Sequence, residues 1–236
     1  MPGSSLWLVP PPSHPLHGIL NTLVSTTLPA RFPRESASSP AVAPHFFAVH
    51  MTLTSEIDPA RYGSDPQAWL DSIPWPSSSS SSSSPGRGGG GGVRVRFERV
   101  DTQDVFFRRC FIRVGFDGVR EVAGLAREYG VVKGGNEGEE GTKKLLFSKE
   151  TEEWLVWWRA EYGPHVSLIY GDVPMEDEVM KQVAKVVREA GVKLPQDSAG
   201  ETEDGSQLDG WDGGVVWLVP TDRPVSEWKP IATRVL

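Results

Sequence analysis

Two tripeptides of one kind, each a histidine followed two residues later by a hydroxyl side chain, constrain the fold of this chain most. They are His50-Met51-Thr52 and His165-Val166-Ser167, and each lies in an apolar stretch. Side chains alternate between the two faces of a β-strand, so each tripeptide would place its histidine and its hydroxyl on one face. The pattern therefore predicts two strands that together present two imidazoles and two hydroxyls to one site.

Two imidazoles and two hydroxyls in one site suit acid–base chemistry on a phosphate. Hydrolysis of a cyclic phosphodiester needs a base that activates water and an acid that protonates the leaving alkoxide, and imidazole can fill either role near neutral pH. We expect His50 to be the base and His165 the acid, although the likeness of the two tripeptides leaves the reverse open. Thr52 and Ser167 are candidate donors to the phosphoryl oxygens. This scheme requires no metal and no cofactor.

Simpler and different interpretations compete with this one. A single His-x-Thr in a strand is usually a packed core histidine, but here two such tripeptides occur among five histidines. A zinc ion bound by His50 and His165 would need further ligands, and the sequence shows no His, Glu or Asp cluster with ligand spacing. A Ser–His–Asp hydrolase of the α/β type would need a Gly-x-Ser-x-Gly turn, which the sequence lacks.

The composition limits the class of protein. The formal net charge of -7 argues against a generally basic nucleic-acid-binding surface. The single cysteine, Cys110, can form neither an internal disulfide nor a cysteine metal site. No stretch approaches the roughly 18 apolar residues of a membrane helix, and the N-terminus lacks the pattern of a signal peptide. We therefore expect a soluble intracellular protein that is a monomer and has no stable nucleic-acid partner.

Apolar periodicity predicts alternating strands and helices along the chain. We expect strands at 5–9, 46–57, 93–100, 104–114, 164–172, 215–219 and 231–236, and helices at 16–28, 58–70, 117–130, 150–162 and 174–190. The segment 74–92 contains a serine run and a glycine run, which have no apolar side chains to bury. We expect this segment to be a disordered insertion in a single two-lobed domain that spans residues 1–236.

The chain also contains a faint internal duplication. The stretch Leu6-Trp7-Leu8-Val9-Pro10 is nearly repeated as Val216-Trp217-Leu218-Val219-Pro220, and the two histidine strands are alike. Each half would then supply a tryptophan strand, a helix and a histidine strand. This favours an α+β fold of two lobes with the site between them.

These features resemble a known family. The two tripeptides are similar to the paired His-x-Thr/Ser signatures of the 2H phosphoesterase superfamily, and within it the chain most resembles the cyclic phosphodiesterases of fungi and plants. The stretches 6–10, 106–111 and 164–170 carry the rest of the likeness. The resemblance implies a two-lobed, pseudo-symmetric, LigT-like α+β fold in which antiparallel sheets and flanking helices surround a central cleft.

The resemblance also implies an activity and the residues that perform it. It implies hydrolysis of 2',3'-cyclic nucleotides to nucleoside 2'-phosphates, and of ADP-ribose 1'',2''-cyclic phosphate, a by-product of tRNA splicing, to ADP-ribose 1''-phosphate. His50 and His165 are then the catalytic pair, Thr52 and Ser167 the phosphate ligands, and Tyr170 a substrate contact. The expected partner is a small nucleotide cyclic phosphate, and the fungal relatives imply a location at the Golgi apparatus.

Two positions depart from the pattern of the family. Val49 stands where the family often has a proline before the first histidine. Strict alternation puts Tyr170 on the strand face opposite His165, so its side chain reaches the site only if the strand bulges or ends near Ile169. Trp7 can either stack on a nucleobase or pack in the core.

Two other functions are compatible with the sequence. One is an RNA-end-processing enzyme or 2'-5' RNA ligase of the same superfamily, favoured by the basic residues Arg94, Arg96, Arg108, Arg109 and Arg113 and opposed by the net charge of -7. The other is a non-catalytic nucleotide-binding module, which the intact set of two histidines and two hydroxyls opposes.

Overall fold

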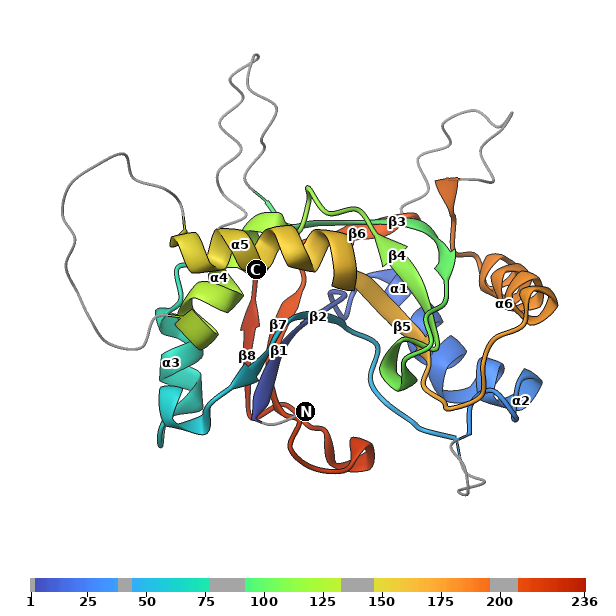
Figure 1. Cartoon of the computed structure of the whole chain (residues 1–236), viewed down its shortest axis with the longest axis horizontal. Coiled ribbons are helices and arrows are strands. Elements are labelled where there is room, and N and C mark those ends of the chain that lie inside the picture. The colour runs from blue at the N-terminus through green and yellow to red at the C-terminus, as the bar shows by residue number, and fades with distance from the viewer. Residues whose placement is uncertain (1–2, 38–43, 77–91, 133–146, 196–207) are drawn as a thin grey trace, which may run out of the picture.

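The computed structural model describes residues 3–37, 44–76, 92–132, 147–195 and 208–236. Within these residues an antiparallel sheet of eight strands curls into a half-barrel, with helices packed around it (Figure 1). The strand order is β6-β3-β4-β5-β2-β1-β7-β8. This architecture confirms the α+β class with antiparallel sheets that the sequence predicts.

Several strands pair with neighbours that are far apart along the chain, whereas β3 with β4 and β7 with β8 are pairs of consecutive strands. The strands are β1 (Ser4–Val9), β2 (Met51–Ile57), β3 (Arg94–Asp101), β4 (Cys110–Val114), β5 (His165–Ile169), β6 (Gly210–Asp212), β7 (Val215–Pro220) and β8 (Ala232–Val235). The two near-repeated tryptophan stretches, in β1 and β7, are direct neighbours, and Trp7 lies opposite Trp217. The first strand and the last two strands of the chain therefore share one half of the sheet.

Helices pack against both halves of the sheet. They are α1 (Pro15–Thr22), α2 (Leu28–Arg31), α3 (Pro66–Ser72), α4 (Arg120–Arg127), α5 (Lys149–Trp157) and α6 (Asp177–Glu189). The π-helical turns η1 (Leu23–Thr27), η4 (Glu128–Val132) and η5 (Trp158–Tyr162) extend α1, α4 and α5. Helix α4 packs on β2, η1 and α2 on β5, α6 on β3, and α3 on β8. The long helix of α5 and η5, yellow in Figure 1, leads directly into β5.

One backbone pairing joins the two halves of the sheet. Met51 in β2 lies opposite Val166 in β5, and within the described residues no other pair links these two strands. Both side chains are fully buried and belong to the same apolar core as Leu6 and Leu8 of β1. Because β2 and β5 diverge on either side of this pair, the sheet curls here instead of continuing flat.

The structure differs from the sequence prediction in several segments. The strand expected from residue 46 begins at Met51, the helix expected over 58–70 is a 3-10 turn, η2 (Pro59–Arg61), followed by α3, and β6 corresponds to no expected strand. The sequence predicts one strand over 104–114, whereas the structure has a 3-10 turn, η3 (Phe106–Arg108), followed by β4. The helix expected from Asp117 begins at Arg120, with Val119 at its N-cap. The insertion expected at 74–92 falls, over 77–91, outside the described residues.

The junction generates a prediction about stability. Met51→Ala should lower the free energy of unfolding by about 2–5 kcal/mol, because it leaves a cavity at the pair that joins the two halves. Val235→Ala, at an exposed position on the edge strand β8, is the control and should change it by less than about 0.5 kcal/mol. Urea denaturation measures both changes. Equal effects would contradict the importance given to the junction.

Candidate active site

The junction places the two predicted tripeptides side by side. Their central residues pair with one another, so the antiparallel register sets His50 across from Ser167 and Thr52 across from His165. These four residues alternate with the buried pair and therefore lie on the opposite, concave face of the sheet. Each histidine faces the hydroxyl residue of the other tripeptide, which gives one site with approximate two-fold symmetry.

Both imidazoles are oriented in the same way. Nδ1 of His50 hydrogen-bonds to the carbonyl oxygen of Ala48 at 2.7 Å, and Nδ1 of His165 to that of Gly163 at 2.9 Å. A carbonyl oxygen only accepts, so Nδ1 carries the proton in each neutral ring. Nε2 is then the basic nitrogen of each ring. Gly163 has a φ of 67°, a conformation that favours glycine and that ends the preceding helix just before β5.

Burial keeps both histidines neutral at neutral pH. Each is 4% exposed. Burial lowers the pKa of His50 to about 4 and that of His165 to about 3. For His165 the positive charges of Arg108 and Arg113 contribute to the lowering. A protonated histidine becomes favourable here only when a negative charge is bound beside it.

The two hydroxyl residues have different surroundings. Ser167 is buried, and its hydroxyl donates to the carbonyl oxygen of Phe107 at 3.0 Å. Thr52 is half-buried and lies beside the phenol of Tyr162. Burial raises the pKa of Tyr162, and hydrogen bonding to Thr52 opposes that rise. The Tyr162 ring is also 5.0 Å from the His165 ring, so Tyr162 belongs to the site.

Trp7 fixes the plane of the His50 ring. The two rings stack with their centroids 3.7 Å apart and an angle of 9° between their planes. Trp7 is 1% exposed, which leaves little of its face for a nucleobase. The structure therefore favours packing of Trp7 against the imidazole over stacking of Trp7 on a substrate.

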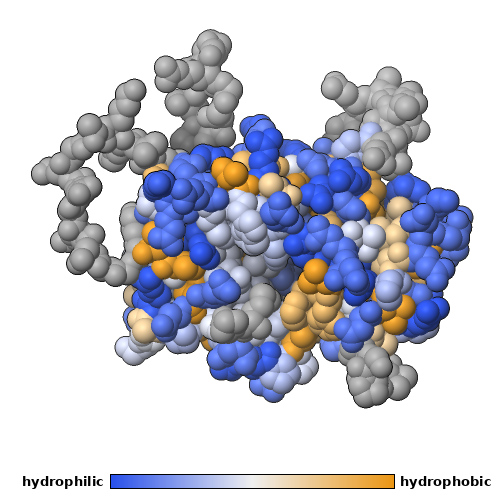
Figure 2. Space-filling view, in the orientation of Figure 1, coloured by the Kyte–Doolittle hydropathy of each residue, from blue (hydrophilic) through white to orange (hydrophobic). Residues whose placement is uncertain are grey.

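Trp228 lies along one side of the site. It follows the 3-10 turn η7 (Val225–Glu227) in the connection between β7 and β8. The centroid of its ring lies 5.7 Å from that of Trp7, 5.8 Å from that of Phe107 and 6.4 Å from that of Tyr170. These rings come from both halves of the sheet, so the aromatic contacts link the halves a second time. Figure 2 shows the surface hollowed between the two halves.

The Tyr170 side chain lies beside the site although simple alternation would point it away. The register between β4 and β5 shifts between Cys110 and Phe111, so β5 bulges, and the strand ends at Ile169. Strand β5 thus both bulges and ends at Ile169, which is the condition that the sequence sets for Tyr170 to reach the site. Burial raises the pKa of Tyr170, and hydrogen bonding to Ser167 opposes that rise. Its contact with a substrate stays a prediction.

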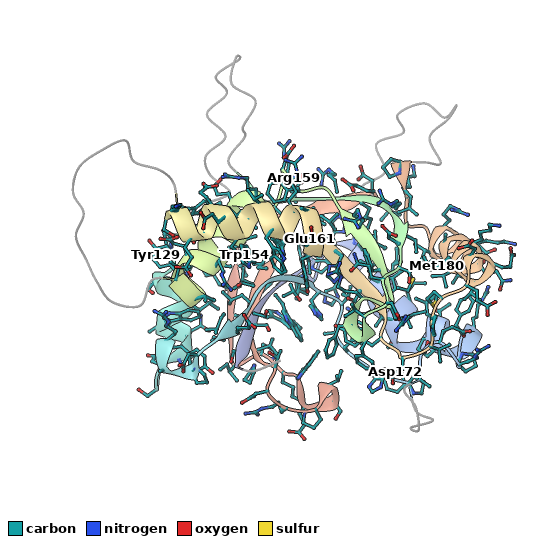
Figure 3. All side chains as sticks on the ribbon, in the orientation of Figure 1. Tyr129, Trp154, Arg159, Glu161, Asp172 and Met180 are labelled. Atoms are coloured by element: carbon teal, nitrogen blue, oxygen red, sulfur yellow. The ribbon has the colours of Figure 1, made fainter. Side chains whose placement is uncertain are left out.

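A pocket of about 480 Å³ is lined in part by Pro164, the residue before His165, and includes neither histidine. The arginines that line it are Arg94, Arg96, Arg113 and Arg159, the last of which Figure 3 labels. Arg113 lies across from His165 in the register of β4 and β5. Arg96 pairs with Asp212 at 2.8 Å and Arg113 with Asp101 at 3.2 Å, so part of the positive charge is already neutralised.

Two residues of the site were missed from the sequence. Tyr162 ends the helix before β5, and its position carries no pattern that would identify it. Arg108 was noted as one of several basic residues. The signal that could have identified it is a charged residue inside the otherwise aromatic and apolar stretch from Phe106 to Phe111.

Two features are absent from the described residues, a cluster of metal ligands and a membrane-spanning helix. No group of three or more His, Cys, Asp or Glu side chains in these segments is placed to hold a metal ion. Among the helices of the same segments, none is long and apolar enough to cross a membrane.

The neutral histidines make the stability of the fold sensitive to acid. Their pKa values are near 6.5 in the unfolded chain and about 4 and 3 when folded, so below pH 6.5 the unfolded chain binds more protons. The two histidines therefore cost no folding free energy above this pH, and the free energy of unfolding decreases as the pH falls below it. Each histidine should cost about 2 kcal/mol of stability at about pH 5.

The variant His165→Asn removes one of these titrating groups. Its free energy of unfolding should fall less between about pH 7.5 and about pH 5 than that of the wild type. His17→Asn, in helix α1, is the matched control. The interpretation fails if His165→Asn loses as much stability over this range as the wild type.

Comparison with known proteins gives this arrangement a family. The chain matches the family model described as "Cyclic phosphodiesterase-like protein" over residues 1–236. It is 54% identical to the 2',3'-cyclic-nucleotide 3'-phosphodiesterase of Neurospora crassa and 37% identical to that of Phaeosphaeria nodorum, with 100% of both chains covered in each case. A protein of the same name from Yarrowia lipolytica is 26% identical over 98% of this chain and 99% of its own. The chain therefore belongs to the cyclic phosphodiesterase-like family.

Proposed function

We propose that this protein hydrolyses 2',3'-cyclic nucleotides to nucleoside 2'-phosphates. Relatives named 2',3'-cyclic-nucleotide 3'-phosphodiesterase align with its full length, which supports this class of reaction. The observation that carries the proposal is the diagonal placement of His50 and His165, each with Nδ1 bound to a carbonyl oxygen. Two Nε2 atoms beside one phosphate provide a base and an acid together.

In the proposed reaction, one histidine takes a proton from water while the water oxygen attacks phosphorus. The new P–O bond forms and the bond between phosphorus and the 3' oxygen breaks. The other histidine gives its proton to the departing 3' oxygen, which becomes the 3' hydroxyl. The two histidines have then exchanged protonation states, and proton exchange with solvent restores the starting arrangement.

We assign the base to His165 and the acid to His50, the reverse of the sequence expectation. Burial lowers the pKa of both rings, and at His165 the nearby positive charges of Arg108 and Arg113 lower it as well, whereas among the described residues no arginine contributes to the pKa of His50. A single proton shared by the pair is therefore more stable on His50. Stacking on Trp7 supports the same assignment, because the face of an indole attracts a cation.

The proposal extends to ADP-ribose 1'',2''-cyclic phosphate, which carries the same kind of cyclic phosphate on a ribose. Its hydrolysis to ADP-ribose 1''-phosphate would place the enzyme downstream of tRNA splicing, which yields the cyclic compound. The family resemblance supports this extension. A location at the Golgi apparatus rests on the same resemblance and stays a prediction.

Phosphorus NMR of 2',3'-cyclic AMP incubated with the protein in EDTA tests the proposed function. The wild type should yield adenosine 2'-phosphate. His50→Ala and His165→Ala should each lower kcat by about 10²–10⁴-fold, because each removes one proton-transfer group. His17→Ala, outside the site, is the control and should keep wild-type activity. ADP-ribose 1'',2''-cyclic phosphate is assayed in parallel.

Three results would count against this function. Full activity of His165→Ala or of His50→Ala would exclude the two-histidine mechanism. A nucleoside 3'-phosphate product would exclude the proposed bond cleavage. Turnover of RNA ends without turnover of either small compound, with a steep dependence on salt, would favour an RNA-end-processing enzyme.

The pH dependence of the rate follows from the lowered pKa values. The reactive free enzyme carries one proton on the histidine pair, and pKa values of about 4 and 3 make this form scarcer as the pH rises. We expect kcat/KM to increase as the pH is lowered from about 8 to about 5, approaching about tenfold per unit. The profile of kcat should extend to higher pH, because bound phosphate raises the pKa of the acid. A maximum of kcat/KM above about pH 8 would contradict this.

A further inference from the structure

Arg108 is a buried guanidinium that pairs with no carboxylate in the described part of the chain. It is 7% exposed, and Nη2 donates to the carbonyl oxygen of Glu161 at 3.2 Å, a residue that Figure 3 labels. Nε is buried and has no partner. Asp101, whose charge reaches Arg108, is ion-paired with Arg99 at 3.0 Å and with Arg113 at 3.2 Å. A buried cation without a counter-charge is costly, so this arrangement suits a site whose anion comes from solution.

The side chain of Arg108 extends along the catalytic groups. At its backbone end, the preceding residue Phe107 accepts the hydrogen bond of the Ser167 hydroxyl. At its other end, the guanidinium carbon lies 4.6 Å from the centre of the Tyr162 ring. That ring is 5.0 Å from the ring of His165. Arg108 therefore begins beside the phosphate-ligand candidate of one tripeptide and ends beside its catalytic histidine.

Two aromatic rings hold the guanidinium next to His165. Arg108 lies over Tyr162 at 4.6 Å and over Phe111 at 5.9 Å. Both rings also contact His165, each with its centroid 5.0 Å from the imidazole. Contacts with ring faces orient the planar group without using its N–H donors. Donors such as Nε are therefore left for a ligand.

The neighbouring arginine shows how a structural arginine is satisfied in this fold. Arg109 is 4% exposed, close to the value for Arg108. It pairs with Asp104 at 2.7 Å and donates to the carbonyl oxygens of Gly171 at 2.9 Å and Asp172 at 3.4 Å. All three guanidinium nitrogens of Arg109 therefore donate to an acceptor, and the carboxylate of Asp104 balances its positive charge. Burial alone therefore does not explain why Arg108 lacks a partner.

We propose that Arg108 binds the phosphoryl group of the substrate and is a third basic residue of the catalytic site. The guanidinium would donate to the non-bridging oxygens, on the side of the phosphate that His165 faces. This assignment rests on the proposed phosphodiester hydrolysis and adds a residue that binds the group being transferred. Negative charge concentrates on those oxygens as water attacks, so the contact is stronger in the transition state than in the ground state.

Matched substitutions at the two arginines test the proposal. Arg108→Gln removes the charge and Arg108→Lys keeps it without the planar fork; Arg109→Gln and Arg109→Lys are the controls. The measurements are kcat/KM for 2',3'-cyclic AMP, the affinity for adenosine 2'-phosphate by calorimetry, and the His165 pKa by NMR titration. Thermal unfolding of each variant shows which of them are folded.

We expect Arg108→Gln to lower kcat/KM by about 10²–10³-fold, the range for losing one transition-state donor. Affinity for adenosine 2'-phosphate should fall by about tenfold or more. The pKa of His165 should rise, because a nearby positive charge is gone. Arg108→Lys should give smaller losses of the same kind. The Arg109 variants should lower thermal stability and leave all three quantities unchanged.

The outcomes separate this proposal from the proposed function. If the wild type turns over cyclic AMP while the Arg108 and Arg109 variants lose the same amount of activity and affinity, Arg108 is structural and the proposal fails. If Arg108→Gln does not fold, the comparison of activity and affinity between Arg108→Lys and Arg109→Lys tests the proposal instead. If the wild type has no turnover, the proposed function fails, and tenfold weaker product binding by Arg108→Gln alone would still support the phosphate contact.

Discussion

A single backbone pairing, between Met51 and Val166, determines both the shape of the sheet and the make-up of the site. On one face it buries two apolar side chains in the core; on the other it brings two histidines and two hydroxyls together. A slip of one residue would exchange these faces, so the apolar core specifies the register that the polar groups need. The arrangement of the polar groups on the concave face is therefore stabilised from the opposite face, by the buried apolar side chains of Met51 and Val166.

The electrostatics of the site favour an anion. Burial lowers the pKa values of His50 and His165 until both rings are neutral, while Arg108 keeps a charge that no nearby carboxylate neutralises among the described residues. A phosphate between these groups would supply the missing negative charge and would make protonation of one imidazole favourable. Removal of water strengthens both effects, because charges interact more strongly in a medium of low polarity.

The parts of the structure that could be predicted from the sequence are those with a local pattern. Alternating apolar residues identified the strands around His50 and His165, and period-2 geometry placed each hydroxyl on the same face as its histidine. The pairing of those strands needed a long-range contact, which no local pattern encodes. The same holds for Arg108: its sequence neighbours are aromatic, but the groups that define its role, Tyr162 and His165, come from another segment. The sequence predicts a strand where the structure has the turn η3, because a run of apolar residues beside a site has the same sequence pattern as a run in a sheet.

The two-fold likeness of the tripeptides raises a chemical difficulty that their surroundings resolve. Two equivalent imidazoles would share a proton equally, and half of the singly protonated molecules would then carry it on the wrong side of the substrate. Here Trp7 stacks on His50, whereas Arg108, Phe111 and Tyr162 surround His165. Aromatic rings lie beside both imidazoles, but among the described residues His165 alone has a guanidinium next to its aromatic neighbours, and this positive charge disfavours a second one, so the proposed mechanism places the proton on His50. In the proposed mechanism the two tripeptides supply the reacting groups, and residues outside the tripeptides give those groups different roles.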